Sequence, residues 1–255
     1  MRKPLVAGNW KMNGDSKSIS ALLDEIVAAL DKAALRRCEV LVFPSFVYLG
    51  SVVARLVDTE VGVGAQDVDA REGGAVTGAV SALMVKNIGC GYAIVGHSER
   101  RTLFGENDQM VAEKYARCLA AGLTPILCVG ETLDERRADK TIAVVTRQLE
   151  AVTAKVGVAG MSAGLVAYEP VWAIGTGESA TPDQAEEVHR ALRDRLTALD
   201  KPMAVAMRLL YGGSVNAENA ESLFSMENVD GALVGGASLQ GQSFVDICNV
   251  ADGIV

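Results

Sequence analysis

LVAYEPVWAIGTG, residues 165–177, is the stretch from which the fold of this chain can be worked out. The apolar run 165–168 has the length of one buried strand. Glu169 follows directly, and Pro170 keeps this residue out of helical geometry, so the strand ends here. The apolar segment 171–174, bounded by a proline and by glycines, has the composition of a lid that closes over a site and excludes water.

Glu169 has two interpretations at this point. Under a lid that excludes water, loss of hydration raises the pKa of a carboxylate toward neutrality, which suits a general base. The same residues also fit a packed connection in which Glu169 is a solvated charge at the end of a strand. The stretch alone leaves both interpretations open.

Similar apolar runs recur along the chain, and amphipathic segments separate them. The helical period is clearest after residue 181, where Thr181-Pro182-Asp183-Gln184 forms a capping box with proline at the first helical position. The other predicted helical segments are 17–35, 107–121 and 138–156. The other predicted strands are 4–8, 39–43, 61–65, 92–95, 124–129, 206–210 and 231–234.

This strict alternation of strands and helices predicts parallel strands joined by crossover helices. Eight such units favour a closed (β/α)₈ barrel over an open doubly wound sheet, and nearly continuous apolar strands fit burial on both faces. Because no linker-like segment interrupts the pattern, we expect residues 1–255 to form a single domain. Functional residues should then lie just beyond the C-terminal ends of the strands.

The composition of the 255 residues argues against several classes of protein. There are 24 Lys and Arg against 32 Asp and Glu, and the net charge of -8 disfavours nucleic acid or an anionic membrane as partner. No apolar run approaches the length of a membrane span, and no signal-peptide pattern precedes the first strand. Five scattered cysteines and two histidines predict free thiols in a cytoplasmic protein, without a disulfide framework or a transition metal.

Polar residues follow two of the predicted strands, where a barrel would gather them at one mouth. Asn9 and Lys11 are two residues apart, so they point the same way if strand geometry persists. His97 stands at the start of a possible helical turn, whose positive end would keep the imidazole neutral. Taken singly, Lys11 also fits an ordinary surface lysine and His97 a structural histidine, as we expect for His189.

Glycine pairs follow the seventh and eighth predicted strands, at residues 212–213, before Ser214, and at residues 235–236. Glycine lets backbone N–H groups approach an anion, and a helix that begins just beyond adds its dipole. A single pair usually marks a turn. Two pairs after strands seven and eight lie where barrels of this class often bind phosphate.

One further pattern is misleading. Residues 175–180, GTGESA, fit the G-x-G-x-x-A fingerprint of dinucleotide-binding folds. In that fingerprint the strand runs directly into the glycines, whereas here the apolar segment 171–174 intervenes. We therefore do not expect a nicotinamide cofactor.

Together these residues resemble the triosephosphate isomerase family along nearly the whole chain. Several long motifs match, in the right order, and coincidence is negligible. They are GNWKMN (8–13), GAQD (64–67), IVGHSERR (94–101), GLTP (122–125), CVGET (128–132), AYEPVWAIGTG (167–177), YGGS (211–214) and GALVGGASL (231–239).

The resemblance implies an enzyme of glycolysis and gluconeogenesis that interconverts dihydroxyacetone phosphate and glyceraldehyde 3-phosphate through an enediolate, without metal or cofactor. Glu169 would be the general base and neutral His97 the electrophile. Lys11 would stabilise the developing negative charge, and Asn9 would help to hold the substrate. The phosphate would be bound mainly by backbone N–H groups of Gly175, Ser214, Gly235 and Gly236.

The resemblance also implies that Glu99 supports the loop of His97 and that Cys128 packs behind the base. Two rival functions remain to be tested. One is an aldolase-type barrel in which Lys11 forms a Schiff base. The other is a phosphate-binding relative without activity, although the intact set of Lys11, His97 and Glu169 argues against it.

A homodimer is the last implication of the resemblance. Its contact would be the connection 69–81, which is long for a compact barrel, and Thr77 would approach Asn9 and Lys11 of the neighbouring subunit. No nucleic acid or membrane partner is implied.

The sequence departs from the family within this connection. Val76 stands where an aromatic residue is usual, and Ala79 stands where a glutamate is usual. That glutamate would pair with Arg100 of the neighbouring subunit, so we expect one ion pair to be missing. Its loss would cost ~1 kcal/mol if Arg100 is partly exposed, and several times more if the arginine is buried and left unpaired.

Overall fold

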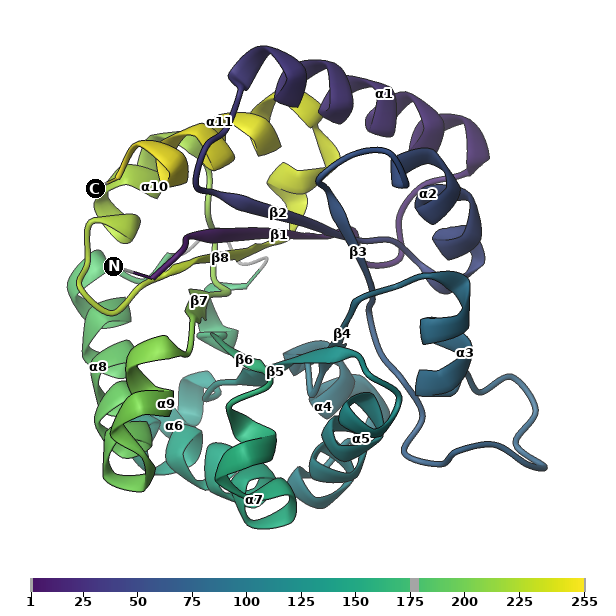
Figure 1. Cartoon of the computed structure of the whole chain (residues 1–255). Helices are drawn as coiled ribbons and strands as arrows, with labels where there is room; N and C mark the ends of the chain where they lie inside the picture. Colours follow the sequence, from purple (N-terminus) through teal and green to yellow (C-terminus); the bar gives the residue numbers. More distant parts are fainter. Residues whose placement is uncertain (1, 175–178, 255) are drawn as a thin grey trace.

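The computed structural model describes residues 2–174 and 179–254. In this part of the chain the strands close a parallel barrel, in which each strand pairs with the next and β8 pairs with β1 (Figure 1). The predicted (β/α)₈ fold is confirmed. The strands are β1 Leu5–Asn9, β2 Glu39–Phe43, β3 Gly62–Ala65, β4 Tyr92–Val95, β5 Thr124–Val129, β6 Leu165–Tyr168, β7 Leu209–Tyr211 and β8 Gly231–Val234.

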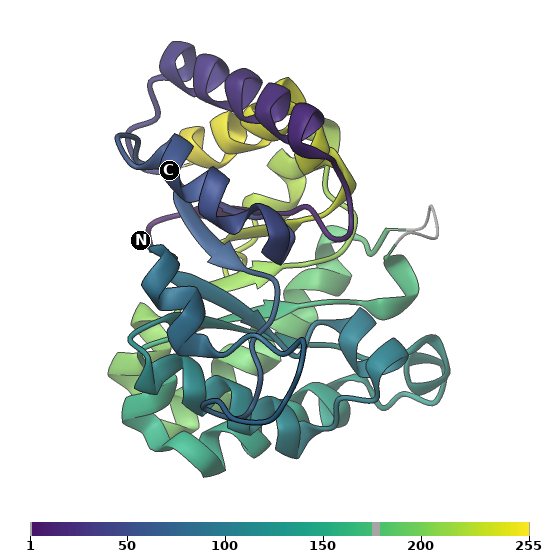
Figure 2. The ribbon, with the colours of Figure 1, turned by 90° about the vertical axis from the view of Figure 1, so that its right-hand side faces the viewer.

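Helices surround the barrel, and both chain ends lie on the side where the strands begin (Figure 2). Among the described residues, no helix is both long and apolar enough to cross a membrane. The α-helices are α1 Ser16–Ala33, α2 Leu49–Leu56, α3 Ala82–Ile88, α4 Ser98–Phe104, α5 Asp108–Ala120, α6 Leu133–Arg137, α7 Thr141–Met161, α8 Pro182–Leu199, α9 Lys201–Ala206, α10 Ala217–Phe224 and α11 Gly241–Gly253. The 3₁₀ helices are η1 Phe46–Tyr48, η2 Val171–Ala173 and η3 Gly236–Leu239.

Helix capping explains one success and one error of the sequence-based boundaries. The predicted capping box at α8 is present, with the Gln184 N–H donating to Thr181 Oγ1 and the Thr181 N–H donating to Gln184 Oε1. The strand predicted at 206–210 is wrong at its start, because β7 begins only at Leu209. Asp200 caps a short additional helix, α9, by accepting from the Met203 N–H at 2.7 Å, and this helix includes Ala206.

Alternation along the strands separates two apolar layers. One set of side chains fills the barrel interior, and the other packs against the helices. Leu165 and Ala167 of β6 point inward, so Glu169 continues the inward series at the mouth. Leu5 and Ala7 of β1 do the same, and Asn9 and Lys11 follow them. The interior layer consists of Leu5, Ala7, Leu41, Phe43, Ile94, Ile126, Cys128, Leu165, Ala167, Leu210 and Leu233.

Candidate functional site

A cavity of about 410 Å³ opens at the end of the barrel where the strands finish. A larger cavity, of about 760 Å³, lies at the other end and is lined by none of the predicted site residues. Gly175, one of those residues, lies outside the described part of the chain. The smaller cavity brings together the other predicted residues, which are Asn9, Lys11, His97, Glu169, Ser214, Gly235 and Gly236.

Glu169 is buried against the imidazole of His97, with only 2% of the residue exposed. Its Oε1 lies 2.9 Å from His97 Nε2, and its Oε2 accepts a hydrogen bond of 2.9 Å from the Ser98 N–H. The interpretation of Glu169 as a solvated charge is therefore wrong. Burial raises the pKa of Glu169, but His97 and the Ser98 N–H outweigh burial and hold this pKa below its usual value. The expected rise in pKa is thus not found in this arrangement.

His97 reaches the cavity because Gly96 turns the chain at the end of β4. Gly96 has φ +71°, and a Cβ there would lie 2.7 Å from Val111 Cγ1, so only glycine fits. His97 then caps α4, and its Nδ1 accepts a hydrogen bond of 3.2 Å from the Glu99 N–H. This hydrogen bond requires an unprotonated Nδ1, so it favours the neutral ring with its proton on Nε2, the nitrogen that faces Glu169.

Two influences on His97 act in opposite directions. Burial of the ring lowers the pKa of His97, while the carboxylate of Glu169 more than offsets burial and raises this pKa above its usual value. The hydrogen bond from the Glu99 N–H favours the unprotonated Nδ1 throughout. The raised pKa therefore depends mainly on contact with Glu169, and Glu99 makes a smaller contribution in the same direction.

Lys11 is fixed by its backbone as well as by its side chain. Its φ is +52°, its N–H donates to Asn9 Oδ1, and its carbonyl oxygen accepts from Ser45 Oγ at 2.8 Å and from Gln66 Nε2 at 2.9 Å. Lys11 Nζ forms an ion pair of 2.5 Å with Glu99, beside the cavity. Lys11 is therefore not an ordinary surface lysine. Glu99, which is expected to support the loop of His97, directs its carboxylate to Lys11, and its Oε2 lies 3.7 Å from His97 Nδ1.

The space behind Glu169 is filled closely. Cys128 is fully buried in the barrel interior, and its thiol interacts with the carboxylate of Glu169, as expected for a packing residue. A Cβ on Gly212 would lie 2.8 Å from Glu169 Cγ. Glycine at 212 therefore leaves the room that the Glu169 side chain needs.

Glu131 was given no role by the sequence, yet it anchors the start of the apolar segment 171–174. It is fully buried, and its Oε1 accepts hydrogen bonds from Tyr168 Oη at 3.2 Å and from Trp172 Nε1 at 2.9 Å. Arg136 lies 3.2 Å from the same oxygen and stacks over the Trp172 ring. The available signal was a carboxylate just beyond the fifth strand, where barrel sites collect.

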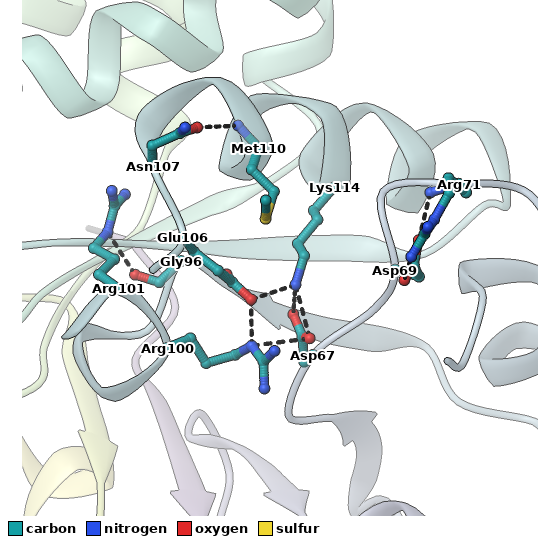
Figure 3. A network of polar contacts seen from close by, with 10 residues as sticks. All are labelled: Asp67, Asp69, Arg71, Gly96, Arg100, Arg101, Glu106, Asn107, Met110 and Lys114. Atoms are coloured by element: carbon teal, nitrogen blue, oxygen red, sulfur yellow. Dashed lines mark hydrogen bonds and ion pairs between the residues drawn. The ribbon is translucent and has the colours of Figure 1, made fainter. Parts of the chain in front are cut away.

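A polar cluster lies behind the loop of His97 (Figure 3). Lys114 Nζ lies 2.7 Å from Asp67 Oδ1 and 2.5 Å from Glu106 Oε1. Arg100 Nε lies 2.9 Å from Asp67 Oδ2 and 2.5 Å from Glu106 Oε1. The cluster joins the end of β3 to α4 and α5. Arg100 is thus partly exposed, at 29% of its side chain, and has two carboxylate partners in its own chain.

Backbone borders the cavity on the side of β7 and β8. A Cβ on Gly236 would meet no atom within 4 Å, and a Cβ on Gly235 would lie 3.6 Å from Lys11 Cε. Ser214 lines the same side, between β7 and α10. Because neither glycine carries a side chain, a small anion could approach the backbone N–H groups here.

Comparison with known proteins agrees with this geometry. The family model described as triosephosphate isomerase matches residues 4–251. The triosephosphate isomerase of Thiobacillus denitrificans is 52% identical over 251 residues, which cover 98% of this chain and 99% of the relative. The enzymes of Alcanivorax borkumensis and Dechloromonas aromatica are each 50% identical, over 98% and 99% of this chain and over 99% and 100% of their own lengths. The chain belongs to the triosephosphate isomerase family.

Proposed function

We propose that this protein interconverts dihydroxyacetone phosphate and D-glyceraldehyde 3-phosphate, a step of glycolysis and gluconeogenesis. The observation that carries the proposal is the buried pair of Glu169 and His97, 2.9 Å apart, at a cavity that Lys11 also lines. The reaction moves one proton between adjacent carbons. A base, donors for an oxygen that becomes negative, and a dry site cover this chemistry.

Glu169 acts as the base in this proposal. Its carboxylate takes the proton from the carbon beside the carbonyl, which leaves an enediolate, and it returns the proton to the neighbouring carbon. To reach the substrate, the carboxylate must leave His97 and the Ser98 N–H, the two groups that lower its pKa. Burial then remains and makes the carboxylate a stronger base. Triosephosphate isomerases are themselves the standard example of such tuning.

His97 and Lys11 act on the oxygen atoms. The neutral His97 donates its Nε2–H to the substrate oxygen once Glu169 has moved, and Lys11 supplies positive charge beside it. Nitrogen NMR of the imidazole in a complex with a phosphorylated inhibitor tests the neutral form. We expect no protonation of His97 between pH 5 and 8, and a titration near 6.5 would contradict this role.

Phosphate binding is assigned to Ser214, Gly235 and Gly236, and to Gly175, which lies outside the described residues. Because the net charge of the chain is -8, an anionic substrate needs local positive potential, and Lys11 supplies part of it. Residues 171–177 are proposed to close over the bound phosphate. Of these, residues 171–174 are described, and Glu131 holds them through Trp172. Slower amide exchange in 171–174 with a phosphorylated inhibitor is the expected result.

A coupled assay with dihydroxyacetone phosphate tests the reaction directly. We expect turnover without added metal or cofactor. Lack of activity in both directions would favour the inactive phosphate-binding relative. Borohydride trapping with a ketose phosphate tests the aldolase alternative, because a Schiff base on Lys11 would be captured covalently. A Schiff base needs an uncharged amine, whereas Lys11 Nζ lies in an ion pair with Glu99.

We further propose a cytoplasmic homodimer formed through the connection 69–81. This connection projects beyond α3, away from the barrel (Figure 1), and Thr77 is exposed on it. Large apolar side chains are exposed on the segments that follow the first four strands, as expected where a partner covers them. They include Met12, Val47, Leu83, Met84, Leu103 and Phe104. The five free thiols support a reducing compartment.

The dimer is tested by sedimentation over a dilution series, with activity followed in parallel. If Thr77 completes the neighbouring site near Asn9 and Lys11, activity falls as the dimer dissociates. A fully active monomer would contradict this role of Thr77.

A further inference from the structure

Two cysteines meet at the end of the barrel opposite the proposed active site. Cys38 lies just before β2, and Cys248 lies in α11. Both are free thiols. Burial raises the pKa of the Cys248 thiol, and the neighbouring Cys38 side chain raises this pKa further. Cys38 Sγ also donates to the Glu39 carbonyl oxygen at 3.5 Å. Cys248 is fully buried, whereas Cys38 is partly exposed. An oxidant from solvent would therefore meet Cys38 first.

The backbone around this pair is held in place by a third residue. Asp252, one turn beyond Cys248 in α11, accepts hydrogen bonds from the N–H groups of Arg36, Arg37 and Cys38, at 3.1, 2.6 and 2.7 Å. These bonds tie the segment before β2 to the same helix that carries Cys248. The backbone of Cys38 is thus held against the turn of α11 that lies directly beyond Cys248.

Cys38 is reached through the larger cavity. This cavity of about 760 Å³ is lined by Cys38 together with Asp31, Asp58, Glu60 and Lys3. Glu39 lines it as well, and its carboxylate is paired with Arg208. Among the described residues, none of the carboxylates of Asp31, Asp58 and Glu60 is in an ion pair with Lys, Arg or His. The cavity is thus lined by four carboxylates and one ammonium, and three of the carboxylates are outside ion pairs, which gives the entrance a negative potential.

We propose that Cys38 and Cys248 are an oxidisable dithiol that closes to an intramolecular disulfide, and that the cavity admits uncharged or cationic oxidants in preference to anionic ones. Nothing in the proposed isomerase reaction requires this pair, so the inference is independent of that function.

The chemistry balances with hydrogen peroxide as the oxidant. The Cys38 thiolate attacks one peroxide oxygen, the O–O bond breaks, and hydroxide leaves and takes up the proton that Cys38 has lost. Cys248 Sγ then displaces hydroxide from the sulfenic acid on Cys38, and the thiol proton of Cys248 leaves with it as water. Two thiols and one peroxide thus give one disulfide and two waters, with two electrons transferred.

Peroxide treatment, followed by blocking of free thiols and peptide mass analysis, tests the pair. We expect two of the five thiols to disappear, a cross-linked peptide pair containing Cys38 and Cys248, and full recovery with dithiothreitol. In the Cys248→Ser variant, oxidation should stop at a sulfenic acid on Cys38, which dimedone traps. Cys90→Ser, which removes another buried thiol, should leave the cross-link intact. Over-oxidation of Cys38 in the unmodified sequence without any cross-link would overturn the proposal.

The preference for cationic over anionic oxidants is tested with two small disulfides of similar size, cationic cystamine and anionic dithiodipropionate. Each rate of closure is divided by the rate of that reagent with a short peptide containing the Cys38 segment, which removes intrinsic reactivity. We expect cystamine to be favoured at least about threefold at low ionic strength. Asp58→Asn combined with Glu60→Gln should bring the ratio close to one. Equal corrected rates with the unmodified protein would overturn the preference for charge.

Discussion

The two ends of the barrel both hold partly or fully buried carboxylates, but the partners of these carboxylates differ. At the end where the strands begin, Glu39 accepts from Tyr92 Oη at 2.5 Å and from Arg208 Nη1 at 2.6 Å. Burial raises the pKa of Glu39, yet Tyr92 and Arg208 bring it below its usual value. At the mouth, Glu169 is held by the imidazole of His97 and by the Ser98 N–H.

The difference lies in how permanent these partners are. Arginine stays charged at any physiological pH, so the charged partner of Glu39 is permanent. The partners of Glu169 are uncharged in the arrangement with a neutral His97, and the carboxylate lines an open cavity. A bound substrate can therefore replace them. We infer that exchangeable partners beside a cavity separate a reactive carboxylate from a structural one.

Replacing each carboxylate by its amide is the strongest test of this comparison. Glu169→Gln removes the proposed base, and we expect kcat to fall by about 10²- to 10⁴-fold with little loss of stability. Glu39→Gln leaves Arg208 without its charged partner, and we expect a loss of stability of about 1–3 kcal/mol with kcat nearly unchanged. The coupled assay and urea unfolding measure the two effects. Near-normal turnover of Glu169→Gln would refute the assignment of the base.

Acid unfolding extends the comparison to His189, a buried group that changes charge near neutral pH in an unfolded chain. His189 is fully buried, and burial lowers the pKa of His189 to about 4, although the Asn228 carbonyl contact partly opposes this. Below pH 6.5 the unfolded chain binds a proton at His189 that the folded chain does not. This contribution to stability is therefore complete above pH 6.5 and is lost as the pH falls toward 4, by about 3 kcal/mol.

Urea unfolding at pH 7 and pH 4.5 measures this loss, with His189→Gln as the reference. The free energy of unfolding should fall by about 2–3 kcal/mol more in the unmodified protein than in the variant. Equal losses in both proteins would show that His189 titrates normally in the folded chain.

Close packing behind the base gives a smaller expected effect. The Cβ of Gly212→Ala would lie 2.8 Å from Glu169 Cγ, so the base must shift, and we expect kcat to fall about tenfold. Gly91→Ala, near the other end of the barrel, is the matched control, because its Cβ would meet no atom within 4 Å. Unchanged kcat in Gly212→Ala would mean that Glu169 tolerates this displacement.

The weakest test concerns the rim of the mouth and depends on the proposed dimer. Ala79→Glu restores the carboxylate expected to pair with Arg100 of the neighbouring subunit. Because Arg100 is partly exposed and already has Asp67 and Glu106, we expect the Kd of the dimer to fall by no more than about fivefold, which is ~1 kcal/mol. Ala75→Glu, in the same connection, controls for charge alone. An unchanged Kd in Ala79→Glu would remove the argument of a missing ion pair.

The sequence predicts the barrel and the cavity residues because both depend on local rules. Alternation of strands and helices indicates the fold, and inward alternation carries Asn9, Lys11 and Glu169 to one mouth. The strand predicted at 206–210 is wrong at its start because an apolar run of this length fits a strand and a capped helix equally well. Glu131 and the Ser98 N–H had no assigned role, since their contacts depend on packing between different strands.

The left-handed backbone conformation of Lys11 determines at which stage a conformational free-energy cost arises. A residue other than glycine in this conformation costs of order 1–3 kcal/mol. The hydrogen bonds from Ser45 and Gln66 to its carbonyl oxygen hold it there in the chain without substrate. The unfavourable conformation is therefore adopted once, during folding, and not again in each catalytic cycle. The folded chain is less stable by this amount, but the Lys11 cation does not have to be reorganised when an anion binds.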